Sequence, residues 1–156
     1  MGSLVIKNIG CIFTGDIKDP VVQGPVAILV ENGQIKAIEK GTPEGDRTID
    51  ANGMTLCPGF IDSHAHPVFG DFTPRQNQLG FIESSLHGGV TGMISAGEVH
   101  LPGRPTDPKG TKALALLAQK SFAKLRPSGV KVYGGSLILE KGLVEEDFKE
   151  LSQDGV

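Results

Sequence analysis

The chain has 156 residues, of which 38% are hydrophobic and 21% charged, and its formal net charge is -3. This composition is typical of a soluble globular protein of about one domain. The charge balance provides no basic surface for nucleic acid or for an anionic membrane, and no apolar run approaches the roughly 18 residues of a membrane span. With no visible secretory signal and with two lone cysteines, Cys11 and Cys57, the sequence predicts a cytoplasmic protein with free thiols.

Residues 1–56 are predicted to form β-structure. Two apolar runs, 26–30 and 34–38, flank Asn32-Gly33, which suits the two positive-φ positions of a type I′ hairpin turn. Further extended segments are expected over 4–14, with a break at Gly10, and over 48–56, with an interruption at Asn52-Gly53. So few short strands cannot enclose a core alone, so this part is expected to need strands from elsewhere.

Residues 57–156 alternate between predicted strands and helices. The expected strands are 60–64, 90–96 and 130–139. The expected helices are one capped at Thr73-Pro74 with Leu79, Ile82 and Leu86 inward, one between Gly110 and Pro127 with Leu114, Leu117, Ala118 and Leu125 inward, and one from Glu145 with Phe148 and Leu151 inward. Alternation of this kind predicts an α/β fold with a parallel sheet. Since a (β/α)8 barrel needs about 250 residues, this part is either a small open sheet or the start of a barrel.

The chemistry is expected at His64-Ala65-His66, at the C-terminal end of the first of these strands. Side chains two residues apart in a strand lie on one face, about 6.6 Å apart along the backbone. Both imidazoles can therefore lean onto one metal ion at about 2.0–2.1 Å. Asp62 has the same parity and is expected to hold one imidazole in its metal-binding tautomer. A His-x-His pair also occurs by chance, and two surface or helix-capping histidines are the alternative.

The string from Pro58 to His66 resembles the first-strand signature of the amidohydrolase superfamily, and within it the enamidase-like cyclic-amide hydrolases. The resemblance runs along essentially the whole chain, through residues 73–76, 86–91, 93–97, 102–105, 129–132 and 138–143. It implies a small β-sandwich joined to a (β/α)8 TIM-like barrel. The chain would then hold an incomplete sandwich portion, 1–56, and an incomplete barrel of about three βα units, 57–156.

The resemblance further implies a pair of divalent metals, zinc with iron as an alternative at one site, whose hydroxide attacks the amide carbonyl of a cyclic amide. It makes His64 and His66 ligands of one metal. The family's other ligands, a bridging carboxylate, two histidines and an Asp on later strands, have no counterpart in the sequence. No catalytic residue is therefore assigned within the chain, and the isolated chain is expected to associate and to be inactive. The full-length protein is expected to be a homo-oligomer.

Three residues are candidates for substrate binding. Arg104, in a Pro-Gly-Arg-Pro segment, can grip a carboxylate in a bidentate manner. His100 and Ser95 follow or end the second strand, on the face where barrel enzymes build their sites. The alternatives are a rim arginine and a solvated histidine. Three other residues are interpreted without a catalytic role: Glu98 as solvated, His87 as a helix-capping residue, and Glu140 as wrongly placed for the bridging carboxylate, which strand order puts one strand later.

Other functions remain open. A metal-free scaffold relative is one, and bound zinc in the full-length form would exclude it. Another amidohydrolase reaction, of the dihydroorotase, hydantoinase or deacetylase type, shares the first-strand histidines, so a substrate screen is needed to separate these. A standalone binding module is disfavoured, because a partial barrel exposes a sheet edge and apolar helix faces.

Overall fold

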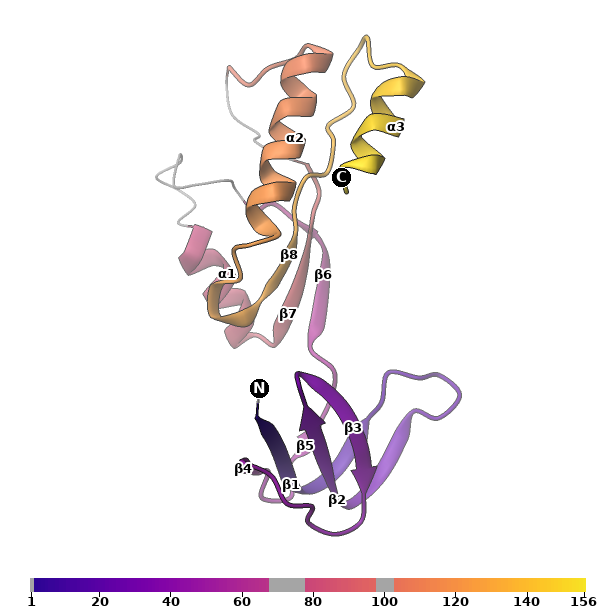
Figure 1. Ribbon diagram of the computed structural model, residues 1–156, viewed down its shortest axis with the longest axis vertical. Coiled ribbons are helices and arrows are strands. Elements are labelled where there is room, and N and C mark those ends of the chain that lie inside the picture. Colours follow the sequence, from indigo (N-terminus) through magenta and orange to yellow (C-terminus); the bar gives the residue numbers. More distant parts are fainter. Residues whose placement is uncertain (1, 68–77, 98–102) are drawn as a thin grey trace. The chain divides into compact units, whose positions relative to one another are not determined.

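The computed structural model describes residues 2–67, 78–97 and 103–156 (Figure 1). The chain divides into two compact units, Met1–Pro58 and Gly59–Val156, which are described separately. Within the described ranges, no helix is long and apolar enough to cross a membrane.

The first unit is a sheet built around one long central strand. Its strands are β1 (Ser3–Phe13), β2 (Val21–Glu31), β3 (Gln34–Glu39), β4 (Arg47–Asp50) and β5 (Thr55–Leu56). β1 pairs antiparallel with β2 and parallel with β4 and β5. The predicted hairpin is confirmed, because β2 and β3 pair antiparallel across Asn32 and Gly33, whose φ angles are 51° and 77°. The predicted interruption between β4 and β5 is confirmed as well, with positive φ at Asn52 and Gly53.

Gly10 differs from its expected role, since β1 continues through it. The β1–β2 ladder is irregular between Ile9 and Cys11, and the backbones approach closely there. A Cβ atom at Gly10 would lie 2.2 Å from the carbonyl oxygen of Gly53, and one at Gly24 would lie 2.1 Å from the carbonyl oxygen of Ile9. Gly10 and Gly24 therefore stand where β1 packs directly against the turn at Gly53 and against β2, with no room for a side chain. The sequence pattern predicts only a break in the strand.

One face of the first unit is apolar and partly uncovered by the described residues. Its centre is a buried cluster that includes Ile9, Val26 and Ile28. Ile38 and Ile49 lie opposite Ile28 and Ile6 in the strand register, and cross-strand partners share a face, yet both remain exposed. The apolar face is thus wider than the core that the described part of the unit encloses.

The second unit has the predicted alternation of strands and helices. Its elements are β6 (Phe60–Ala65), α1 (Gln78–His87), β7 (Val90–Ser95), α2 (Pro108–Phe122), the 3-10 turn η1 (Pro127–Gly129), β8 (Lys131–Tyr133) and α3 (Glu145–Gln153). The strands pair parallel in chain order, β6-β7-β8. The expected parallel sheet is therefore confirmed, and the described strands form an open sheet. The expected cap at Thr73-Pro74 lies outside the described residues.

The core of this unit lies on one face of the sheet. It joins β6, β7 and β8 to helices α1 and α2 through Ala65, Ile82, Met93, Ala118, Phe122, Val130 and Val132. On the strands, four large apolar residues remain well exposed: Phe60, Ile61, Ile94 and Tyr133. Ile94 and Tyr133 are register partners, so one apolar patch continues across β7 and β8. Among the described residues, nothing covers this patch as the helices cover the core face.

The buried face of α2 differs from the predicted one. Ala118 is buried as predicted and Leu114 is half-buried, but Leu117 and Leu125 are 48% and 42% exposed. The other buried residues of α2 are Thr111, Ala115 and Phe122. The reason for the difference is the close approach of the segment after β8: a Cβ atom at Gly134 would lie 2.3 Å from Cδ2 of Phe122, and one at Gly135 would lie 2.7 Å from the carbonyl oxygen of Ala115. The segment therefore packs on the side of α2 that carries Ala115, Ala118 and Phe122, and not on the side that carries Leu117. Strand β8 ends at Tyr133, directly before these two glycines and earlier than the predicted residue 139.

Helix α2 begins at Pro108 because Asp107 caps it. The Oδ1 atom of Asp107 accepts a hydrogen bond from the Gly110 N–H at 2.9 Å, and Pro108 fills the first helical position, where no N–H is needed. We expect Asp107→Ala to lower the free energy of unfolding by about 1 kcal/mol. Asp107→Asn keeps an acceptor oxygen and is expected to lower it much less. Urea unfolding of both variants measures the difference, and equal losses would contradict the capping role.

Candidate metal centre

Strand β6 orients the two histidines through the residue between them. Ala65 is 3% exposed and packs in the helix-facing core. Its backbone carbonyl accepts the Ala96 N–H at 2.8 Å, which fixes the end of β6 against β7. Since successive side chains of an extended segment alternate between faces, His64 and His66 are directed away from the face that the helices cover. Pro67, which is buried, follows directly and cannot extend the ladder.

The imidazole rings of His64 and His66 lie together. Their centroids are 5.2 Å apart and their planes are inclined by 82°. Two imidazoles bound to one tetrahedral ion through bonds of about 2.0–2.1 Å have centroids about 5 Å apart. The observed separation therefore fits two ligands of one metal ion. His64 is exposed and His66 half-buried, so a ligand or further protein groups can approach the pair.

Asp62 forms a hydrogen bond with the backbone of His64. Its Oδ1 atom accepts a hydrogen bond from the His64 N–H at 3.0 Å. The β6–β7 register is irregular between Asp62 and Ala65, so simple alternation does not carry from Asp62 to the histidines. The contact fixes the backbone at His64. Its expected action on an imidazole stays a prediction.

The part of the chain that the structure describes does not bring the remaining ligands of a catalytic metal to the pair. Within residues 2–67, 78–97 and 103–156, the His, Cys, Asp and Glu side chains form no group of three that could hold a metal ion. A catalytic zinc has three protein ligands and one open position. The histidine pair would supply at most two of these ligands, and the described residues do not complete the set.

Arg104 has a protein partner that the sequence analysis did not foresee. Its Nη2 atom lies 2.5 Å from Oε1 of Glu140, and its Nη1 atom donates to the carbonyl oxygen of Pro105 at 3.2 Å. The two side chains are only 24% and 19% exposed. The pair joins the segments that follow β7 and β8, so part of the guanidinium fork expected for a substrate carboxylate is already engaged. The signal for this pair in the sequence is the opposite charge of Arg104 and Glu140, which lie in the loops that follow two neighbouring strands.

The other candidates are placed less favourably. Ser95 is 2% exposed. Its hydroxyl accepts the Gly97 N–H at 3.4 Å, and its carbonyl accepts the Ser136 hydroxyl, which favours a role in joining the ends of β7 and β8. His100 and Glu98 lie outside the described residues. His87 is exposed and is the last residue of α1, which is the position expected for a helix-capping residue.

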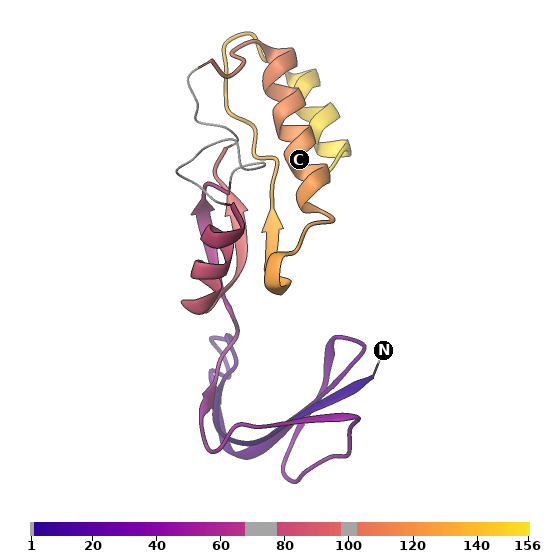
Figure 2. The same ribbon diagram turned by 90° about the vertical axis from the view of Figure 1, so that its left-hand side faces the viewer.

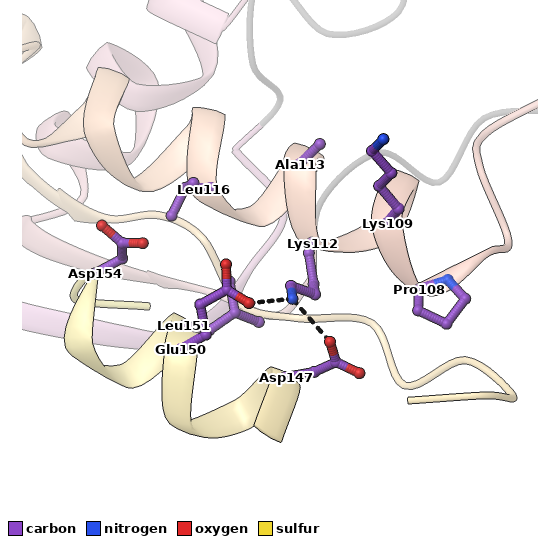
Figure 3. Close-up of a pocket in the computed structure, with 9 residues that line it drawn as sticks. All are labelled: Pro108, Lys109, Lys112, Ala113, Leu116, Asp147, Glu150, Leu151 and Asp154. Atoms are coloured by element: carbon purple, nitrogen blue, oxygen red, sulfur yellow. Dashed lines mark hydrogen bonds and ion pairs between the residues drawn. The ribbon is translucent and has the colours of Figure 1, made fainter. Parts of the chain in front are cut away.

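A separate pocket lies between α2 and α3 (Figure 3). Lys112 is at its centre, with Nζ 2.8 Å from Asp147 and also paired with Glu150. These bonds raise the pKa of Lys112, and Lys112 together with the Val144 N–H lowers the pKa of Asp147. In this pocket Lys112 pairs with Asp147 and Glu150, and these three residues come from helices, whereas the histidine pair lies at a strand end. The pocket is therefore not part of the candidate metal centre.

Known proteins match the chain along its whole length. It is 56% identical to enamidase from Eubacterium barkeri over 160 residues, which cover 100% of this chain and 41% of enamidase. It is 34% identical to dihydroorotase from Aquifex aeolicus over 163 residues, covering 99% of the chain and 35% of that protein. The solved structure of enamidase, a member of the amidohydrolase superfamily, matches with a TM-score of 0.89 and 54% identity, covering 99% of this chain and 41% of that one. No family model matches the chain.

The chain belongs to the amidohydrolase superfamily. The predicted resemblance, including the enamidase-like subgroup, is confirmed. The fold class is confirmed too, because the open sheet β6-β7-β8 and its helices correspond to the N-terminal part of the superfamily's barrel. The chain spans about two-fifths of the length of enamidase.

Proposed function

We propose that the protein containing this chain is a hydrolase that cleaves a carbon–nitrogen bond of a cyclic amide. The observation that carries the proposal is the 56% identity with enamidase over the entire chain. This similarity includes β6 with its histidine pair, and the ring geometry of that pair supports metal binding independently.

His64 and His66 would hold one divalent metal ion, with zinc the proposed metal and a second ion, zinc or iron, beside it. Such a centre lowers the pKa of a bound water toward about 7 and polarises an amide carbonyl. Ala65 and Asp62 fix the backbone that carries the two imidazoles. The pair is thereby held before a metal arrives, which reduces the ordering that binding must impose.

Arg104 would contact a carboxylate or carbonyl of the substrate with the donors that Glu140 and Pro105 leave available. A guanidinium has five N–H donors in a rigid fork, and the two described contacts use Nη1 and Nη2. His100 and Ser95 remain weaker proposals for the same role. We also propose a cytoplasmic homo-oligomer that acts on a small molecule and has no nucleic-acid or membrane partner, on the basis of composition and of the resemblance.

Ring opening of the dihydroorotase type is the second candidate function. The 34% identity with a dihydroorotase, over 99% of the chain, favours it over the hydantoinase and deacetylase reactions. Both candidates use the same pair of histidines, so the choice depends on the substrate and not on the metal.

A substrate panel on the full-length protein tests the proposal. We expect turnover of a cyclic enamide or lactam at a rate at least about tenfold above dihydroorotate and a hydantoin, complete loss of turnover after dialysis against a chelator, and recovery on adding zinc. Faster turnover of dihydroorotate would favour the second candidate. A purified protein free of divalent metal, inactive on every substrate after zinc is supplied, would favour the metal-free scaffold.

A further inference from the structure

One face of the sheet β6-β7-β8 packs against helices, and the other carries the histidine pair. Helices α1 and α2 lie to the left of β6 in Figure 1, and Figure 2, seen from that side, shows α1 in front of β6 and β7. Met93 and Val132 are register partners, and both belong to the helix-facing core. Because successive side chains of a strand alternate between faces, their neighbours Ile94 and Tyr133 point to the opposite face, to which the histidine pair is also directed.

Tyr133 lies at nearly the same level of the sheet as the pair. Its register partner is Ile94, which directly precedes Ser95, and Ser95 is the register partner of Ala65 between the two histidines. Along the strands, Tyr133 is therefore within about one residue, or about 3.3 Å, of the level of the pair. Across the sheet, β8 is two strand spacings from β6, which is about 10 Å. A small cyclic molecule between the phenol and the imidazoles can contact both.

The backbone that carries the phenol is fixed from the helix side. Tyr133 is the last residue of β8. Val132 before it is buried in the core, and a Cβ atom at Gly134 after it would lie 2.3 Å from Cδ2 of Phe122. Both neighbours thus pack toward α2. A side chain held in this way needs little further ordering when it contacts a ligand.

Lys131 contacts the phenol ring. Lys131 and Tyr133 are two residues apart on β8 and so share a face, and the Lys131 Nζ atom lies 4.2 Å from the centroid of the Tyr133 ring. The ammonium is attracted by the negative face of the aromatic ring. This contact uses the ring face and leaves the hydroxyl, which can both donate and accept a hydrogen bond.

We propose that Tyr133 is a substrate-contacting residue, whose hydroxyl donates a hydrogen bond to an oxygen atom of the cyclic amide and whose ring packs against the ring of that substrate. The proposal rests on the proposed function. The sheet corresponds to the N-terminal part of the superfamily's barrel, and barrel enzymes build their sites at the C-terminal ends of the strands. An aromatic surface with one polar end is typical of sites that bind small molecules.

Kinetics of full-length variants test the contact. Tyr133→Phe removes only the hydroxyl, and we expect it to raise KM for the cyclic amide about five- to tenfold while kcat changes less than about threefold, because the bond is made in the ground state and the transition state alike. Tyr133→Leu also removes the aromatic ring and is expected to raise KM further. Ser85→Ala is the matched control: it removes a hydroxyl that donates to the Phe81 carbonyl within α1 at 2.9 Å, and both constants should stay unchanged.

A second readout does not need catalysis. The full-length protein is labelled with 3-fluorotyrosine, and the ¹⁹F signal of Tyr133 is the one that Tyr133→Phe removes. Adding the cyclic amides of the substrate panel to the metal-depleted protein, where no turnover is expected, should shift this signal. A shift without turnover after zinc is supplied would support the contact and contradict the hydrolase assignment.

Three results would overturn the proposal. The first is an unchanged KM in both Tyr133 variants. The second is a fall in kcat at constant KM that is accompanied by loss of metal or of thermal stability, since a purely structural role would produce it. The third is turnover of a cyclic amide whose binding leaves the ¹⁹F signal of Tyr133 unmoved, and this result would leave the hydrolase assignment intact.

Discussion

Replacing His64 and His66 together with alanine is expected to remove the metal ion that we propose the pair binds, and to lower kcat/KM for the proposed cyclic-amide substrate by at least about 100-fold. The two rings lie 5.2 Å apart at the end of β6, and neither belongs to the buried core. The fold should therefore survive the change, as circular dichroism would verify. The decisive measurement is the metal content of the purified full-length protein by mass spectrometry.

His87→Ala serves as the control for this experiment. It removes an exposed histidine from the last turn of α1, so metal content and activity should remain at the unmodified level. If the double variant at positions 64 and 66 retained its full complement of metal, the metal centre would have to be sought elsewhere in the protein.

Gly24→Ala is expected to cause the largest loss of stability among single methyl additions to the first unit, about 3 kcal/mol. The new Cβ atom would lie 2.1 Å from the carbonyl oxygen of Ile9 and 2.7 Å from that of Gly10. Both are backbone atoms of the central strand, so neither can turn aside as a side chain would. Urea unfolding, or the loss of soluble protein on expression, measures the effect.

Gly33→Asn is the matched change at a permissive glycine. Gly33 has a φ of 77° and no heavy atom within 4 Å of an added Cβ, and Asn tolerates this left-handed conformation in turns. Its cost should stay below about 1 kcal/mol. Equal losses of unfolding free energy for the two variants would contradict this explanation. They would mean that backbone conformation, and not the close packing of β2 against β1, sets the requirement for glycine at position 24.

The features that could be predicted from the sequence are those that a local rule determines. Asn32-Gly33 specifies its hairpin through two positive φ angles. The alternation of strands and helices predicts the parallel sheet, which has the expected order. His64 and His66 could be placed together because their separation depends on three consecutive residues of one extended segment.

The features that could not be predicted depend on contacts between distant residues. Helical periodicity predicts that Leu117 is buried, but Gly134 and Gly135 bring another segment against the side of α2 that carries Ala118 and Phe122. Arg104 and Glu140 lie 2.5 Å apart although 36 positions separate them in the sequence (140 minus 104). Neither relationship follows from the spacing of residues within a single element.

Ala65 links two properties that are usually considered apart. On one side of β6 its methyl group touches the cluster that contains Met93, Ala118 and Phe122, and immediately before and after it come the two imidazoles. The packing of Ala65 thus holds in place the segment that carries both histidines. A larger side chain at position 65 would therefore disturb the helix-facing core and the segment that carries both histidines at the same time.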